Sequence, residues 1–193
     1  MIVYLIKLFK KIKTVSLLFC CILILTFTIT PAFATATITI INADTAGEGF
    51  NDTTTFIPVT GNRALTLGQA RLNALQHAAN LLGSIITSNI DIKIQAQFNP
   101  KGGNASSAVL ASAGAAFVNR DFTNATFANT WYPIALAEKL SGVNIATGNE
   151  THEISMEVNS DIDGNIVLST NHWYYGFDSQ PPGSDIDFIT VAM

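Results

Sequence analysis

Side chains that carry oxygen alternate along one short segment of the chain. Asn159, Asp161 and Asp163 are followed by Gly164, which is how a calcium loop begins, because calcium prefers oxygen ligands and glycine allows a sharp turn. Thr170 stands where such a loop carries its bidentate Glu. Asn, Asp and Gly are also the residues of ordinary turns, so the sequence favours a turn and keeps calcium binding as the alternative.

The three histidines do not form a zinc motif. A zinc-binding helix carries two His four residues apart, so that both imidazoles face one metal ion. His152 is followed by Glu153, but Met156 occupies the position of the second His, in a segment that alternates like a strand. His77 and His172 belong to other predicted elements. The sequence therefore predicts no zinc site within the chain itself.

No arrangement typical of a nucleophilic enzyme is present. The sequence contains no G-x-S-x-G motif, and no phosphate-binding glycine loop follows a predicted strand. Trp173, Tyr174 and Tyr175 form an aromatic cluster that could stack on a sugar or a peptide. The sequence favours instead a structural role, closing a sheet against the following helix, because aromatic side chains dominate protein cores.

The N-terminal segment 1–34 has the features of a signal peptide. Four lysines precede an apolar run at 14–30, and Ala32-Phe33-Ala34 supplies the small residues of a cleavage site. Thr35 is the predicted first residue of the mature protein, and a secreted or periplasmic location follows. The alternative is an uncleaved membrane anchor, which the length of the apolar run just permits.

Removal of the signal peptide changes the composition. Six basic and fourteen acidic residues remain, which gives a net charge of −8, and both cysteines are lost. An acidic surface argues against nucleic acid or an anionic membrane as a partner. Residues 35–193 have the length of one domain or of part of a larger one. The oligomeric state has no signature in the sequence.

Strand and helix periodicities alternate along residues 35–193. Strands are predicted at 37–40, 90–98 and 153–160, where apolar and polar residues alternate. A long helix is predicted to begin at Thr66, with Gly83 near its end allowing close packing against a sheet. Its predicted inner face consists of residues spaced by three and four: Gly68, Leu72, Leu75, Ala79, Leu82 and Ile86.

The second half of this region predicts further elements. The small residues at 106–118 predict a strand or loop close to another backbone, and Thr130 or Pro133 begins a helix that ends at Gly142. Its predicted apolar stripe is Trp131, Ile134, Ala137 and Leu140. Asp163-Gly164 predicts a hairpin turn between 153–160 and an extended segment at 166–168. A last helix is predicted from Ser184 or Asp185 to Met193, with no stop signal.

Together these elements predict an α+β domain, that is, a mixed α/β fold whose last part is absent. Four blocks of sequence allow a more specific comparison, with a known protein family. They are GEGFND at 47–52, TLGQARLNALQHAA at 66–79, WYYG at 173–176 and DIDFITVAM at 185–193. In order and rough spacing they resemble a family of secreted bacterial metzincin-like zinc metallopeptidases. The resemblance spans essentially all of 35–193.

The resemblance implies a zincin-like N-terminal subdomain, with a twisted mixed sheet backed by two helices and incomplete at its C-terminus. In the family, the last block runs directly into H-E-x-x-H, so the zinc ligands are expected after Met193. An edge strand of the sheet borders the substrate cleft and can pair with a peptide backbone. For this strand the candidates are Val109, Leu110 and Phe117, in the stretch rich in small residues.

Two functions from different classes follow. The first is the N-terminal fragment of a secreted zinc-dependent endopeptidase, which is expected to be inactive in this chain because the zinc ligands are missing. The full-length family member would bind zinc and a peptide or protein substrate. The alternative is a non-enzymatic secreted binding module, whose contact surface would be the sheet edge and the aromatic cluster.

Overall fold

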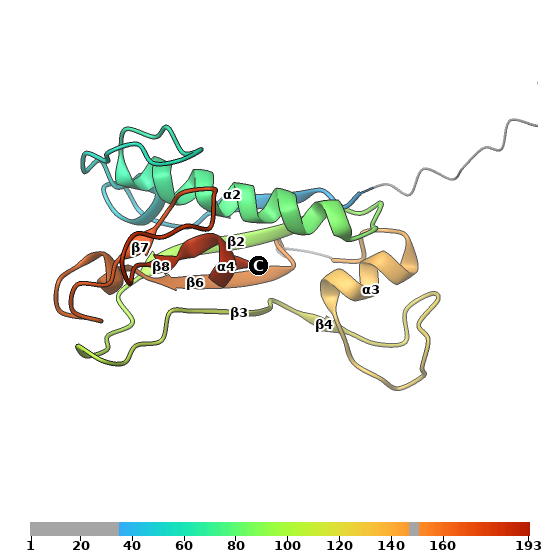
Figure 1. The fold of residues 1–193 in the computed structure, drawn as a ribbon. Coiled ribbons are helices and arrows are strands. Elements are labelled where there is room, and N and C mark those ends of the chain that lie inside the picture. The colour runs from blue at the N-terminus through green and yellow to red at the C-terminus, as the bar shows by residue number, and fades with distance from the viewer. Residues whose placement is uncertain (1–34, 147–150) are drawn as a thin grey trace, which may run out of the picture. The chain divides into compact units, whose positions relative to one another are not determined.

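A four-stranded mixed sheet, with strand order β1-β2-β6-β3, forms the centre of the structure (Figure 1). The computed structural model describes residues 35–146 and 151–193, so the predicted signal peptide lies outside the described residues. β1, β2 and β6 are parallel, and β3 pairs antiparallel with β6 at one edge. The bounds are Ile38–Asn42 for β1, Ile92–Asn99 for β2, Ala111–Ala115 for β3 and Ile154–Asn159 for β6.

Helices and short strand pairs complete the described region. The α-helices are α2 (Leu67–Ile85), α3 (Ile134–Ser141) and α4 (Phe188–Ala192), and the 3-10 helices are η1 (Gly49–Asn51) and η2 (Ser160–Asp163). β4 (Val118–Asn119) pairs with β5 (Tyr132–Pro133), and β7 (Trp173–Tyr174) with β8 (Ile186–Asp187). This arrangement confirms the predicted α+β fold with a mixed sheet. In 35–146 and 151–193, no helix is long and apolar enough to cross a membrane.

Two helices pack against one face of the sheet. Leu75 of α2 and Phe188 of α4 belong to the same buried cluster as Phe98 of β2 and Val158 of β6. In Figure 1, α4 lies close to α2 and to the middle strands of the sheet. Residues between the buried ones, such as Gln97, point to the opposite face, as the alternation in the sequence predicts.

The long helix α2 begins as predicted, but its buried face differs from the predicted one. Thr66 caps the helix, and its hydroxyl accepts a hydrogen bond from Gln69 N at 3.4 Å. Leu72 and Leu82 are only half-buried. The buried residues are mostly small: Gly68, Ala70, Arg71, Ala74, Leu75, Ala78, Ala79 and Gly83. Gly68, Leu75 and Ala79 are buried as predicted, whereas the leucines at 72 and 82 shifted the predicted face, because alanines contribute weakly to an apolar pattern.

Gly83 is a point of close contact between α2 and the segment that leads into β1. A Cβ atom at Gly83 would lie 2.5 Å from the carbonyl oxygen of Ala36. The substitution Gly83→Ala is therefore expected to lower the free energy of unfolding by about 1–2 kcal/mol, although alanine is the better helix former. Ser84→Ala, at the next and exposed position, should change it by less than about 0.5 kcal/mol. Urea denaturation measures both, and a stabilised Gly83→Ala variant would contradict the close contact.

The hairpin predicted at Asp163-Gly164 is wrong. Ser160–Asp163 forms the 3-10 helix η2, and residues 166–168 form no strand. β6 pairs with β2 on one side and β3 on the other, so neither of its edges is free for a hairpin partner. The turn-forming residues serve a helix start instead, because the Asn159 side chain accepts a hydrogen bond from Asp161 N at 3.0 Å.

The predicted second helix is α3, with a later start. It begins at Ile134, and Gly142 ends it in the left-handed conformation with φ 76°. Ile134 and Ala137 are buried as predicted. Trp131 precedes the helix and is 59% exposed, so its place in the predicted apolar stripe is wrong.

The aromatic cluster closes the core against α4, as the sequence favours. Trp173 and Tyr175 are buried, and the centroid of each ring lies 5.4 Å from that of Phe188 in α4. The helix begins later than the predicted Ser184 or Asp185. Asp187 is its cap, and the carboxylate accepts a hydrogen bond from Thr190 N at 3.2 Å.

Candidate functional site

β3 presents unpaired backbone groups along an edge of the sheet. Asn159 N donates to Leu110 O, and Ala116 N donates to Glu153 O, both at 2.9 Å, so the two ends of β3 are bonded to β6. In an antiparallel ladder the bonded residues alternate with residues whose N–H and C=O groups point outward. The outward groups belong to every second residue: Ala111, Ala113 and Ala115.

The three residues predicted for a substrate-cleft edge flank this strand. Val109 and Leu110 directly precede β3, and Phe117 follows its last residue by two positions. Val109 is 56% exposed, Leu110 packs partly against the core cluster, and the Phe117 carbonyl accepts a hydrogen bond from Ile134 N at 3.1 Å. The structure thus brings the three residues to one sheet edge, while their contact with a substrate stays a prediction.

The side chains of β3 leave this edge accessible. Its sequence is Ala-Ser-Ala-Gly-Ala, and all of its residues after Ala111 are exposed. A hollow of about 320 Å³ adjoins the strand, lined by polar residues that include Ser112 of β3 and Glu157 of β6. The hydrogen bond from Lys101 lowers the pKa of the Glu157 carboxyl, so this hollow holds a carboxylate at neutral pH.

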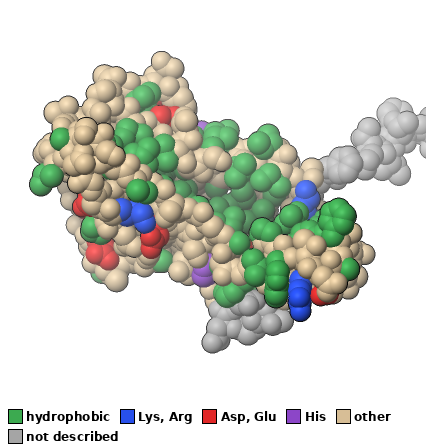
Figure 2. Space-filling model, turned by 90° about the horizontal axis from the view of Figure 1, so that it is seen from below, with side chains coloured by type: hydrophobic (Ala, Val, Ile, Leu, Met, Phe, Trp, Pro, Cys, Tyr) green, Lys and Arg blue, Asp and Glu red, His purple; other side chains and the backbone are tan. Residues whose placement is uncertain are grey.

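Apolar side chains lie around the edge as well. Figure 2 shows the molecule from below Figure 1, on the side where β3 and β4 lie, and apolar side chains gather around a hollow near the centre of this face. Val109, just before β3, and Val118, in β4, are 56% and 55% exposed. A peptide laid along β3 would find backbone hydrogen-bonding groups on the strand and apolar surface close by.

Asn159 and Asp161 fix the loop that leads into β3. The amide of Asn159 donates to Gly102 O at 3.0 Å and to Val109 O at 2.8 Å. Its carbonyl oxygen accepts from Lys101 N at 3.2 Å as well as from Asp161 N. Asp161 in turn accepts from Gly102 N at 2.8 Å. Of the three candidates for a turn or a calcium loop, these two use their oxygens to hold backbone N–H groups.

Asp163, the third of those candidates, forms a buried ion pair with Arg71. Arg71 is 3% exposed, and its Nη2 atom lies 2.6 Å from Asp163 Oδ2. Tyr175 donates its hydroxyl to the same carboxylate oxygen at 2.8 Å. The guanidinium also donates to Gly49 O at 2.8 Å and lies 4.6 Å from the ring centroid of Phe98. This cluster joins α2, β2, η1, η2 and the segment after β7.

Burial governs the acid–base properties of this cluster. It raises the pKa of the Asp163 carboxyl above its ordinary value, although the Arg71 charge opposes the shift. The pKa of the Tyr175 phenol is raised well above its ordinary value, first by burial and then by the Asp163 carboxylate. The phenol therefore remains protonated and serves as a hydrogen-bond donor.

The described histidines lie in separate places. His77 stacks on Phe177 with ring centroids 4.2 Å apart, and His152 Nε2 lies 3.0 Å from Ser155 Oγ. His172 Nδ1 lies 3.9 Å from Asp185 Oδ1. In 35–146 and 151–193, no group of three His, Cys, Asp or Glu residues could hold a metal ion. These residues do not fit a zinc site.

Comparison with protein-family models, with curated proteins and with solved structures finds no match for this chain.

Arg71 was not among the residues predicted to matter. A signal for it exists in the sequence, because Arg71 lies between Gly68 and Leu75 at helical steps on the buried side of the predicted helix. A lone charged residue at such a position requires a partner. That the partner is Asp163 could not be read from the sequence, since 92 residues separate the two.

Proposed function

We propose that residues 35–193 are the N-terminal, substrate-framing part of an exported metzincin-like zinc endopeptidase. In this proposal β3 pairs with the extended backbone of a peptide substrate, and α4 is the start of the helix that carries the zinc ligands. Zinc supplies a polarised water for peptide hydrolysis when it is bound. The 193-residue chain itself is proposed to be inactive, because none of its described residues fits that metal site.

The observation that carries the proposal is the antiparallel edge strand β3. Its outward backbone groups and small side chains suit the addition of a peptide strand, in which main-chain hydrogen bonds give the affinity. A strand that accepts a substrate must also be held in register. Asn159 meets this need by tying residues 102 and 109 to the end of β6.

The orientation of α4, that is, which of its residues face the core and which are exposed, agrees with the proposal. Phe188 and Ile189 face the core, and Thr190 is exposed. Residues four apart share a face of a helix, so position 194 of a continued helix would lie on the side of Thr190. A ligand following Met193 would therefore point away from the core, where a substrate can reach it.

Translation of the DNA beyond codon 193 in all three frames tests the proposal. An H-E-x-x-H motif is expected within a few residues, and the polypeptide that includes it should hold one zinc ion and cleave casein in a reaction that EDTA stops. Absence of the motif from all three frames would overturn the peptidase proposal. The remaining hypothesis would then be a secreted binding module that uses the same sheet edge, at β3.

The 193-residue chain provides a separate prediction. The purified chain is expected to hold no stoichiometric zinc and to leave casein intact, because its three histidines lie in separate places. Metal analysis by mass spectrometry and a casein assay with and without EDTA measure both properties. EDTA-sensitive proteolysis by this chain alone would contradict the assignment of the ligands to a later segment.

Substitution at the edge itself tests the role of β3. Ala113→Pro removes an outward N–H group and is expected to weaken binding of fluorescently labelled, unfolded casein by about tenfold or more. Ala113→Val keeps the N–H group and is the control. Fluorescence anisotropy measures binding to the 193-residue chain. Equal losses in the two variants would mean that side-chain bulk, and not backbone pairing, controls the interaction.

A further inference from the structure

The hollow beside β3 lies on the face of the sheet opposite to α2 and α4. Phe98 and Val158 belong to the core on the helix side. Gln97 and Glu157, their neighbours along β2 and β6, therefore point to the other face. Both line the hollow together with Ser112 of β3. Among the described residues of this lining, Glu157 alone carries a charge, so the hollow is a polar depression with one carboxylate.

Glu157 lies in a row with the peptide position that would pair beside Ser112. The register places Ser112 of β3 directly opposite Glu157 of β6. Opposite side chains on neighbouring strands share a face of the sheet, so a peptide residue opposite Ser112 would point to the face of Glu157. The peptide backbone would lie about 10 Å from β6, two strand spacings of about 4.8 Å. The long side chains of lysine and arginine can cross that distance to a glutamate, whereas short side chains cannot.

The residues of β3 on this face leave the path open. Ser112 has a small side chain, and Gly114, the next residue on the same face, has none. Both are exposed. A Cβ atom added at Gly114 would meet no atom of another described residue within 4 Å, apart from its two chain neighbours. A long side chain from an added strand can therefore lie across β3 and enter the hollow.

Glu157 is held in place and remains accessible. Lys101 Nζ lies 2.6 Å from Glu157 Oε2, and Gln97 Nε2 donates to Glu157 Oε1 at 3.1 Å. The hydrogen bond from Lys101 lowers the pKa of the Glu157 carboxyl, which is therefore ionised at neutral pH. The Glu157 side chain is still 43% exposed. A cation that enters the hollow can therefore bind at Oε1, where it competes with Lys101 for the negative charge.

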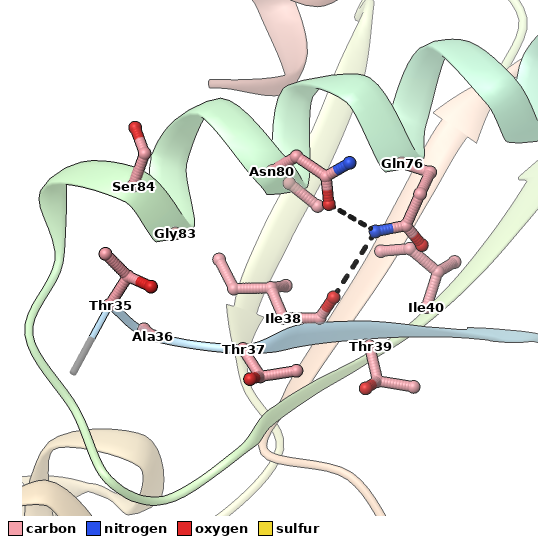
Figure 3. A pocket seen from close by; sticks show the side chains of 11 residues that line it. Thr35, Ala36, Thr37, Ile38, Thr39, Ile40, Gln76, Asn80, Gly83 and Ser84 are labelled. Carbon is pink, nitrogen blue, oxygen red and sulfur yellow. Dashed lines mark hydrogen bonds between the residues drawn. The ribbon is translucent and has the colours of Figure 1, made fainter.

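A second hollow, of about 500 Å³ between β1 and α2, does not provide an equivalent site (Figure 3). None of the described residues that line it is charged. Ala36 N donates to Gly83 O at 3.1 Å and to Ile86 O at 2.9 Å. The Gln76 amide reaches Ile38 O at 3.5 Å. The outer side of β1 is thus already bonded in part to α2 and to the residue that ends it.

We propose that Glu157 selects substrates with a lysine or arginine opposite Ser112, through an ion pair that crosses β3. This inference rests on the proposed pairing of a peptide with β3. The charge of the whole region supports it, because residues 35–193 contain six basic and fourteen acidic residues, a net charge of −8, which attracts basic segments at long range. Glu157 contacts a substrate side chain in this proposal and takes no part in bond cleavage.

Blocked, fluorescently labelled peptides that differ only at alternate positions test this specificity. Those positions carry lysine, the neutral norleucine or glutamate, and serine stands between them. By fluorescence anisotropy, the 193-residue chain is expected to bind the lysine peptide about three- to fivefold more tightly than the norleucine peptide, and the glutamate peptide most weakly. Equal binding of the three peptides would overturn the role of Glu157 and leave pairing with β3 intact. Failure of all three to bind would overturn both.

Two variants with opposite expected effects locate the contact. Glu157→Gln keeps the size of the side chain and should abolish the preference for lysine over norleucine. Lys101→Met removes the competing cation and should increase that preference by about twofold. Asp91→Asn removes an exposed charge outside the hollow lining and should leave the preference unchanged. A purely structural ion pair would instead weaken all three peptides alike in both Glu157→Gln and Lys101→Met, and that result would overturn the proposal.

Discussion

Replacing Arg71 with methionine is expected to lower the free energy of unfolding by about 3–5 kcal/mol at neutral pH. The substitution leaves the Asp163 carboxylate largely buried without its cation, because Arg71 Nη2 is 2.6 Å away and Tyr175 alone cannot neutralise the charge. It also removes the hydrogen bond to Gly49 O, which ties η1 to α2. Urea denaturation followed by circular dichroism measures the loss.

Arg120 is a matched control for this substitution. Arg120 also has a carboxylate nearby, that of Asp121 at 3.5 Å, and its guanidinium lies 4.9 Å from the ring centroid of Trp131, but its side chain is 49% exposed. Arg120→Met is expected to change the free energy of unfolding by less than about 1 kcal/mol, because solvent screens exposed pairs. Similar losses for Arg71→Met and Arg120→Met would contradict the importance of burial.

The pH dependence of Arg71→Met gives a second check. Burial already raises the pKa of the Asp163 carboxyl, and removal of Arg71 takes away the charge that opposes this shift. A carboxyl whose folded pKa exceeds its unfolded pKa stabilises the protein at low pH, and this contribution is lost as the pH rises through the folded pKa. The loss caused by Arg71→Met should therefore be smaller at acid pH than at pH 7. Adding Asp163→Asn to Arg71→Met should recover part of the lost free energy of unfolding at pH 7.

Replacing Asn159 with alanine is expected to lower the free energy of unfolding by about 3 kcal/mol and to loosen β3. Asn159 is fully buried, and alanine would leave the carbonyls of Gly102 and Val109 and the N–H groups of Lys101 and Asp161 without its amide. Because this amide ties the loop before β3 to the end of β6, faster hydrogen exchange is expected at Ser112 and Gly114, which face β6.

Asn104 is the control for that prediction. Its side chain also caps nearby backbone, accepting from Ser106 N at 2.9 Å and Ser107 N at 3.0 Å, but the residue is exposed. Asn104→Ala is expected to cost less than about 1 kcal/mol and to leave exchange in β3 unchanged. Unchanged exchange at Ser112 and Gly114 in Asn159→Ala would contradict the role of Asn159 in holding the edge.

The stability of β3 connects these substitutions to the proposed function. An edge strand binds a peptide well only when its outward groups are already in place, since ordering them on binding costs affinity. Asn159→Ala should therefore weaken casein binding at β3 even though Asn159 lies outside the proposed contact. Arg71→Met removes a contact of η2, the 3-10 helix that Asn159 caps, so in conditions where the variant is folded it is expected to weaken this binding less than Asn159→Ala does.

The sequence by itself determined the features that depend on neighbouring residues. Alternation located β2 and β6, Thr66 marked the start of α2, and Gly142 marked the end of α3, because side-chain direction and capping act within one or two turns of chain. The close approach at Gly83 also followed from one residue type. The α+β fold class followed from the order of these elements.

Only the tertiary structure decided which elements became neighbours. The same turn-forming residues suit a hairpin, a calcium loop or a 3-10 helix, and η2 formed because β2 and β3 already occupy both edges of β6. Arg71 met Asp163 for the same reason: local pattern shows that a buried charge needs a partner, but the partner is set by packing between distant segments. The open edge at β3 likewise exists only because of the order in which the four strands pair.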